Sequence, residues 1–177
     1  MDTFFEQIVK KKKTAVEWLI VVGTLLVGIA LSVFFFYFLY PIGAFVSVGV
    51  IYVAWLLITA QNKEFEYCVT NGDIDIDLII SKRKRKRIVS VAGRKIQALL
   101  PYDAKVSTHG YQRVVMAAES LQESGLWYFT YHSKKNGRTL VVFHPNERVL
   151  GAFYGGLEDQ LVKRDTHNAA AAAGIIL

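Results

Sequence analysis

This chain of 177 residues has one cysteine and three prolines, and it contains a long segment without charged residues. The single cysteine, Cys68, can form no disulfide within the chain, which suits a reducing cytoplasm. The three prolines, Pro41, Pro101 and Pro145, each interrupt the pattern where a break or turn is expected. No Asp, Glu, Lys, Arg or His occurs from residue 18 to residue 62. This absence excludes a proton relay, an ion ligand and a charged-substrate site in that segment.

Motifs of the common enzyme chemistries are also absent. The sequence has no recognisable pairing of a nucleophile with a base, no phosphate-binding glycine loop, and no ligand spacing among its four histidines. Asp73, Asp75 and Asp77 alternate, but the glycine and glutamate of a calcium loop do not follow them, so we interpret them as a solvent-facing stripe. The sequence therefore predicts no catalytic, cofactor-binding or metal-ligating residues, and a protein that is not an enzyme.

The longest feature of the sequence is an apolar run from Ala15 to Ala60, in which Glu17 is the one charged residue. A single helix of that length would extend roughly 69 Å, whereas the hydrocarbon core of a membrane is about 30 Å thick. The sequence Tyr40-Pro41-Ile42-Gly43 breaks the run near its middle. We therefore expect residues 14–60 to form a transmembrane hairpin of two helices, near 16–39 and 42–60. A signal peptide is excluded because the apolar segment is too long and lacks a cleavage pattern.

Charged and aromatic residues predict the orientation of this hairpin. Basic residues precede the first helix and follow the second, and the turn between them carries none, so the positive-inside rule predicts that both termini are cytoplasmic. Two tryptophans lie near the cytoplasmic ends, where interfacial aromatic residues are enriched. The chain is thus expected to be a multi-pass membrane protein. Its predicted topology and interface anchors are Lys10, Lys11, Lys12, Lys13, Trp18 and Trp55.

Residues 1–13 are predicted to form a short interfacial amphipathic helix. Thr3 and Glu6 have the spacing of a capping box, and the apolar residues at positions 4, 5, 8 and 9 fall on one helical face. Anchoring to the membrane surface is the role that this pattern favours. The alternative is a solvated tail that only sets the topology.

Residues 61–165 suffice for one small domain, in which turn signals separate several strands. Asn71-Gly72 is the strongest hairpin signal and lies between two alternating segments. A helix over residues 111–121 is an alternative to one of the strands. The expected strands are 64–70, 73–80, 87–91, 95–100, 113–118, 126–133 and 139–143.

The C-terminal third contains a second hairpin signal, a helix signal and a biased tail. Asn136-Gly137, as a two-residue turn, would pair Tyr131 with Val142. The segment Asn146–Lys163 has helical spacing and is expected to cover a sheet as one amphipathic helix. Residues 166–177 include five consecutive alanines and are predicted to be a low-complexity tail, disordered or foreign to the domain.

Six consecutive basic residues follow the strand at 73–80. Residues 61–177 contain 17 Lys and Arg against 12 Asp and Glu, and without these six residues the counts are 11 and 12. The run is expected to lie close to the cytoplasmic leaflet, because the chain leaves the predicted hairpin at Ala60. Each basic residue there contributes about 1 kcal/mol toward binding anionic lipid. The candidate lipid-binding or partner-binding residues are Lys82, Arg83, Lys84, Arg85, Lys86 and Arg87.

Three interpretations of this basic run stay open. Its cations can pair with the aspartates of the preceding strand and need no ligand, contact anionic lipid headgroups, or bind an acidic protein partner. Nucleic acid is not expected as a partner, because no aromatic platform or nucleic-acid-binding fold signature accompanies the run.

The order of these elements resembles a known fold. Antiparallel strands with hairpins at Asn71-Gly72 and Asn136-Gly137, followed by a C-terminal helix, are similar to the pleckstrin-homology (PH) fold. The whole chain resembles small bacterial membrane proteins of unassigned function that join a two-helix anchor to such a domain. This resemblance implies a membrane-anchored α+β protein of the bacterial plasma membrane, with a transmembrane helical hairpin before a PH-like antiparallel β sandwich or barrel that a C-terminal helix caps.

The resemblance implies a binding or scaffolding protein without a cofactor. Eukaryotic PH domains often bind phosphoinositides through basic residues in the first hairpin loop, and the corresponding loop here, 71–73, has none. We therefore transfer the fold and not the ligand. The chain is expected to be integral to the lipid bilayer and to present its basic run to anionic lipid headgroups or to an unknown protein partner. The alternative is a structural subunit of a larger membrane assembly, recognised through its transmembrane hairpin.

Overall fold

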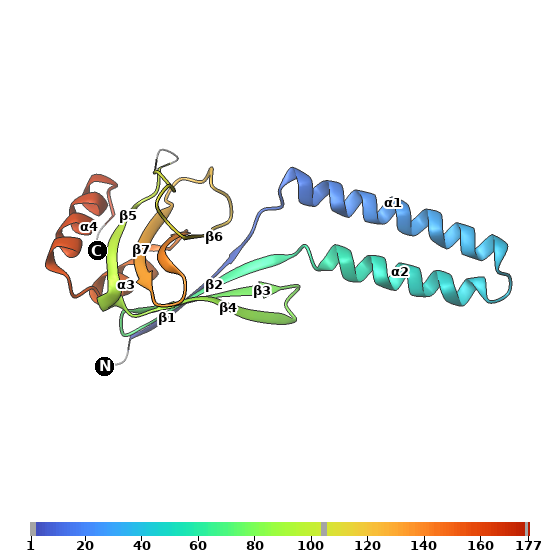
Figure 1. Cartoon of the computed structure of the whole chain (residues 1–177), viewed down its shortest axis with the longest axis horizontal. Coiled ribbons are helices and arrows are strands. Elements are labelled where there is room, and N and C mark those ends of the chain that lie inside the picture. Colours follow the sequence, from blue (N-terminus) through green and yellow to red (C-terminus); the bar gives the residue numbers. More distant parts are fainter. Residues whose placement is uncertain (1–2, 104–105, 176) are drawn as a thin grey trace. The chain divides into compact units, whose positions relative to one another are not determined.

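The computed structural model describes residues 3–103, 106–175 and 177 (Figure 1). Its internal contacts divide the chain into two compact units. The sheet unit comprises Met1–Lys11, Glu64–Ile79 and Arg85–Leu177. The helical unit comprises Lys12–Lys63 and Ile80–Lys84, so it interrupts the sheet unit twice along the sequence.

Two helices make up most of the helical unit: α1 (Ala15–Phe38) and α2 (Gly43–Thr59). A capping box begins α1, because the Thr14 hydroxyl accepts the Glu17 N–H while the Glu17 carboxylate accepts the Thr14 N–H. Gly43 begins α2, and a Cβ added there would lie 1.9 Å from the Phe35 carbonyl oxygen, so the close turn requires glycine. The structure thus contains two helices separated near residues 40–43, and their membrane-spanning role stays a prediction.

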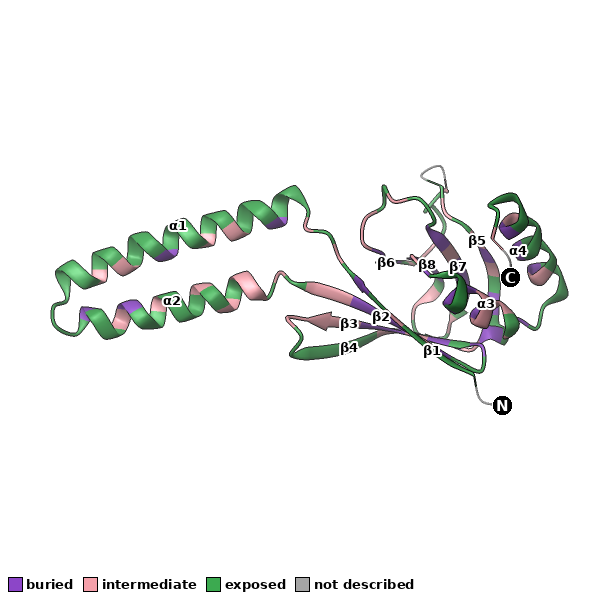
Figure 2. Ribbon diagram, turned by 180° about the vertical axis from the view of Figure 1, so that it is seen from behind, coloured by how far each residue is buried: buried purple, intermediate pink, exposed green. Residues whose placement is uncertain are grey.

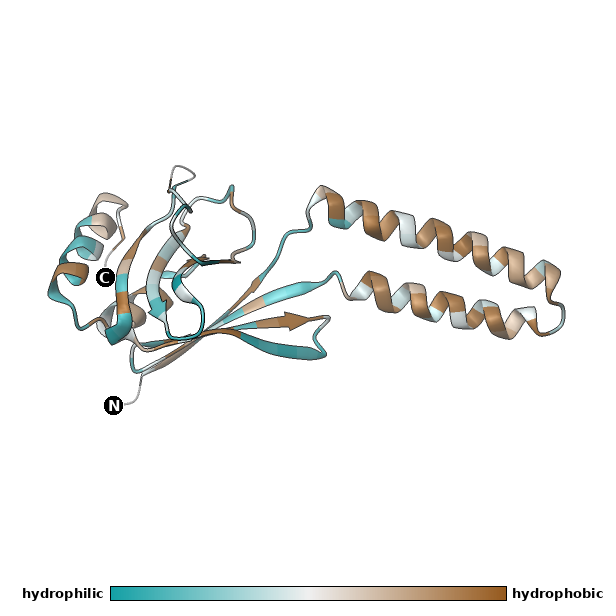
Figure 3. Ribbon diagram, in the orientation of Figure 1, coloured by the Kyte–Doolittle hydropathy of each residue, from teal (hydrophilic) through white to brown (hydrophobic). Residues whose placement is uncertain are grey.

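Small residues bring these two helices into close contact. A Cβ on Gly28 would lie 3.2 Å from the Ala54 Cβ, and the Ser47 hydroxyl donates to the Ser32 carbonyl at 2.8 Å. Most of the remaining helical surface is exposed and apolar (Figures 2 and 3). In the described part of the chain, α1 is the one helix that is long and apolar enough to span a membrane, whereas α2 has 17 residues.

The helix predicted within residues 1–13 is wrong, because Phe4–Lys10 form strand β1. It pairs antiparallel with β2 (Lys63–Thr70), so that Lys10 lies opposite Glu64. Val9 is buried in the core, as expected for the inward side of a strand. Pairing with a strand distant in sequence outweighs the local helical spacing.

Gln7 attaches β1 to residues 144–146 of the sheet unit. Its side-chain amide donates to the His144 carbonyl at 3.0 Å, and its side-chain oxygen accepts the Asn146 N–H at 2.7 Å. Thr3 does not cap a helix as predicted, and its backbone N–H instead donates to the Asn71 side chain. The first strand is thus an integral part of the sheet unit.

Sheet A has the strand order β1-β2-β3-β4, where β3 is Asp73–Ile80 and β4 is Lys84–Val91. Asn71 and Gly72 connect β2 to β3 with φ values of 51° and 83°, which confirms the predicted hairpin. The strand β4 begins three residues earlier than predicted and therefore contains Lys84–Arg87 of the basic run.

Sheet B has the order β5-β7-β8-β6. Strand β6 is parallel to β8, so the sheet is mixed, and the alternative helix over 111–121 is not formed. A short 3-10 helix (Gly93–Lys95) leads into the first strand of this sheet. The strands are β5 (Ile96–Pro101), β6 (Arg113–Ala117), β7 (Trp127–Ser133) and β8 (Gly137–Phe143).

The predicted register of the second hairpin is wrong by three residues. Tyr131 lies opposite Thr139 rather than Val142. Ser133 pairs with Gly137, which has a φ of 66°, so the loop between the strands has three residues instead of two. Gly137 is thus the first residue of β8 and belongs to the strand ladder rather than to the turn.

The single C-terminal helix predicted over 146–163 is wrong, because two helices are formed: α3 (Glu147–Gly155) and α4 (Gln160–Ala172). Asn146 caps α3 as expected by accepting the Val149 N–H, and Asp159 caps α4. Glycines at the end of α3 favour the break.

The predicted low-complexity tail is mostly helical. Thr166 and Ala170 of α4 are buried, and the Thr166 hydroxyl donates to the Leu99 carbonyl of β5 at 2.8 Å. Alanine has a high helix propensity and leaves room for close packing, so the alanine-rich composition suits this helix. Disorder is therefore excluded for α4.

Aromatic side chains fill the core of the sheet unit. The rings of Phe129 and Phe143 lie 5.3 Å apart, and Phe153 of α3 contacts Phe129 at the same distance. Tyr67 is fully buried, donates to the Ala117 carbonyl and accepts the His144 N–H at 3.2 Å. Burial raises the pKa of Tyr67 well above its usual range.

Candidate functional site

The basic run is divided by the structure into paired arginines and unpaired lysines. In the sheet unit, Arg85 contacts the Glu66 carboxylate at 2.7 Å, and Arg87 contacts Asp75 at 2.8 Å and Asp77 at 2.9 Å. The hydrogen bond to Asp77 and the charge of Asp75 raise the pKa of Arg87. The interpretation of the aspartates as a solvent-facing stripe is wrong for Asp77, which is 5% exposed.

Arg83 is engaged in the helical unit, at the turn between β3 and β4. Its guanidinium lies over the Trp55 ring, 4.6 Å from the ring centroid. Ser81 and Lys82 adopt positive φ in this turn, and the Ser81 N–H donates to the Asn62 carbonyl at 2.7 Å. The turn is thus attached to the end of α2 by a backbone hydrogen bond and a cation–π contact.

Lys82, Lys84 and Lys86 are exposed. Within the described part of the chain, their ammonium groups form no ion pair or hydrogen bond. Arginine suits internal pairing because its planar guanidinium binds a carboxylate or an aromatic face, whereas an ammonium is compact and strongly hydrated. Within the basic run, the three lysines are therefore the cations without an internal partner among the described residues.

Three of the six predicted interface anchors, Lys13, Trp18 and Trp55, lie near an end of α1 or α2. The Lys13 ammonium is 5.4 Å from the centroid of the Trp18 ring, and Lys63 pairs with Glu17 at 3.4 Å. Lys10 lies in β1, and Lys11 and Lys12 lie between β1 and α1. Each predicted tryptophan is thus in contact with a basic side chain.

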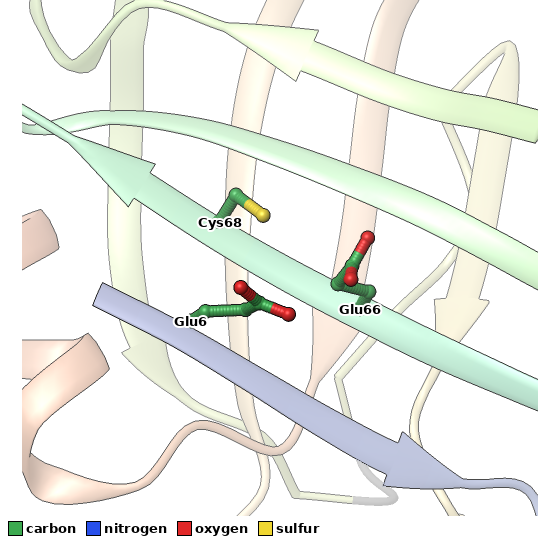
Figure 4. Close-up of side chains that lie close together, drawn as sticks. All are labelled: Glu6, Glu66 and Cys68. Atoms are coloured by element: carbon green, nitrogen blue, oxygen red, sulfur yellow. The ribbon is translucent and has the colours of Figure 1, made fainter. Parts of the chain in front are cut away.

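Sequence reasoning missed a second cluster, formed by Glu6, Glu66 and Cys68 (Figure 4). Their potential ligand atoms all lie within 4.8 Å of one another. Glu6 is opposite Cys68 in the β1–β2 ladder, and Glu66 is on the same face of β2. Burial raises the pKa of Glu66 and that of Cys68. Only the pairing of β1 with β2 reveals this cluster, because Glu6 and Glu66 are 60 positions apart in the sequence.

A family model described as "Bacterial PH-like domain (DUF6106)" matches residues 1–163. The chain belongs to this family. The match to the PH-like family includes β1 and both apolar helices, so these elements are part of the family pattern. No curated protein and no solved structure matches the chain. PH-like domains are generally binding modules rather than catalysts, which favours a binding or scaffolding role in general terms.

Proposed function

We propose that this protein is a non-enzymatic binding or scaffolding module of the bacterial plasma membrane. In this proposal, α1 and α2 form a membrane hairpin with both ends in the cytoplasm, and Lys82, Lys84 and Lys86 contact anionic lipid headgroups. The supporting observation is the contact of Arg83 with Trp55 at 4.6 Å, which attaches the tip of the basic run to an end of the apolar helical pair. An end with tryptophan and basic residues is typical of a membrane interface.

The expected electrostatic free energy of binding to anionic lipid comes from the three lysines rather than from all six basic residues. At about 1 kcal/mol for each cation near an anionic surface, the lysines together contribute about 3 kcal/mol. This contribution is expected to fall as salt rises, because exposed charges are screened within about 10 Å at 0.1 M ionic strength. An acidic protein partner would use the same three ammonium groups.

Amine labelling of the full chain in lipid nanodiscs tests this proposal. In nanodiscs with anionic lipid, Lys82, Lys84 and Lys86 should react several-fold more slowly with an amine reagent than in zwitterionic nanodiscs, and salt should reverse the protection. Lys134 and Lys135 are exposed residues at the β7–β8 loop and serve as internal controls. Equal labelling of the three lysines in both lipids would contradict the lipid role.

A further inference from the structure

The cluster of Glu6, Glu66 and Cys68 combines two carboxylates and a thiol on one face of sheet A (Figure 4). This is the face opposite the core, since Tyr67 and Val69 alternate with these residues on β2 and are fully buried. The three side chains therefore come from two adjacent strands, whose pairing fixes their backbone positions.

The burial of Glu66 distinguishes this cluster from an ordinary group of surface acids. Glu66 is 1% exposed, and the Arg85 guanidinium forms an ion pair with one of its carboxylate oxygens, Oε1, at 2.7 Å. The other oxygen, Oε2, is buried without a hydrogen-bond partner among the described residues. A buried carboxylate oxygen in that condition is costly, and it is rare unless an ion or another group satisfies it.

We propose that Glu6, Glu66 and Cys68 bind a divalent cation of borderline softness, with Zn²⁺ as the best match. Zinc takes carboxylate oxygens at about 2.0–2.2 Å and thiolate sulfur at about 2.3 Å, so three donors already within 4.8 Å of one another need only a small closure. A thiolate ligand disfavours Mg²⁺ and Ca²⁺, which prefer oxygen donors.

The charges of this site balance when the cation is bound. Two carboxylates and one thiolate carry three negative charges, which the divalent cation and the Arg85 guanidinium neutralise. The Cys68 thiol loses its proton to solvent on binding. Arg85 is a positioning residue, because its contact with Oε1 orients the Glu66 carboxylate and leaves Oε2 for the metal. The fourth tetrahedral position is left for water.

A bound cation would also fasten β1 to β2. These strands belong to the sheet unit, and in sequence they lie on either side of α1 and α2. Since the ion binds the paired strands and not the separated ones, it stabilises the folded sheet by mass action.

Zinc titration of the untagged full chain in detergent tests the proposal. The expected result is one Zn²⁺ per chain, with affinity reduced at least about tenfold by Cys68→Ser and by Glu66→Gln. The matched control is Glu64→Gln, two residues away on the same strand and outside the cluster, which should retain the affinity. Absence of stoichiometric binding, or equal affinity in Cys68→Ser and the unaltered chain, would overturn the proposal.

Two measurements on the unaltered chain make the test independent of variant folding. Zn²⁺, but not Mg²⁺, should slow alkylation of Cys68. Co²⁺ in place of zinc should give the near-ultraviolet charge-transfer absorption of a cobalt–thiolate bond. If alkylation proceeds equally with and without Zn²⁺ and this absorption is missing, Cys68 is not a ligand and the proposal fails.

Discussion

At the scale of single residues, Gly72, Gly93 and Gly156 bring three segments of the sheet unit into backbone contact. A Cβ on Gly93 would lie 2.4 Å from the Gly156 carbonyl oxygen and 2.6 Å from that of Gly72. Both obstacles are backbone atoms, so a rotamer change cannot relieve them. The turn after β2, the start of the 3-10 helix and the end of α3 therefore meet only if these positions lack side chains.

Gly93→Ala is expected to destabilise the fold by about 1–3 kcal/mol through this overlap. Gly151→Ala in α3 is the matched control, because a Cβ there meets nothing within 4 Å. Because alanine has a higher helix propensity than glycine, Gly151→Ala should stabilise the protein by about 0.5–1 kcal/mol. Denaturant midpoints of the two variants in detergent provide the comparison, and a Gly93→Ala midpoint equal to that of the unaltered chain would contradict the steric argument.

At the scale of elements, α4 is a structural component of the sheet unit. Val162, Thr166 and Ala170 lie on one side of the helix and are buried, whereas Ala171 and Ala172 are exposed. The hydrogen bond from Thr166 to the Leu99 carbonyl attaches this side to β5. The composition of α4 thus reflects close packing.

Ala170→Glu is expected to lower the free energy of unfolding by at least about 2 kcal/mol, because it buries a charge in a space fitted to a methyl group. Ala171→Glu makes the same chemical change on the exposed side and should have an effect within about 0.5 kcal/mol. Thermal unfolding of both variants measures the difference. Equal destabilisation by the two substitutions would show that α4 does not pack through Ala170.

At the scale of the whole molecule, the apolar helical pair is inserted between two adjacent strands of one sheet. Strand β1 ends at Lys10, which lies opposite Glu64 at the start of β2, so the two chain ends that flank the insertion are close together. A chain that starts at residue 61 would lack β1, the buried Val9 and both hydrogen bonds of Gln7.

A chain with residues 12–62 replaced by a short Gly/Asn linker is expected to fold in water, because the linker closes β1 and β2 into a hairpin. The same chain without residues 1–11 should be less stable by at least about 3 kcal/mol, since it loses a core side chain and paired backbone groups. Urea unfolding compares the two. Equal midpoints would mean that β1 is dispensable.

The sequence by itself determined the local features of this protein. Pro41 and Gly43 separate the two apolar helices, Asn71-Gly72 forms its hairpin, and Asn146 begins a helix, because each acts through its own backbone preference or through neighbours in the chain. The PH-like domain was also predictable, from the order of these local signals.

Only the tertiary structure decided which distant groups meet. Residues 4–10 have helical spacing in the sequence, yet pairing with β2 makes them a strand. The basic run is uniform in sequence, yet contacts with Trp55, Glu66 and the aspartates of β3 use its arginines and leave its lysines available. The Glu6, Glu66 and Cys68 cluster has no local signal, because its donors come together only when strands on either side of a long insertion pair.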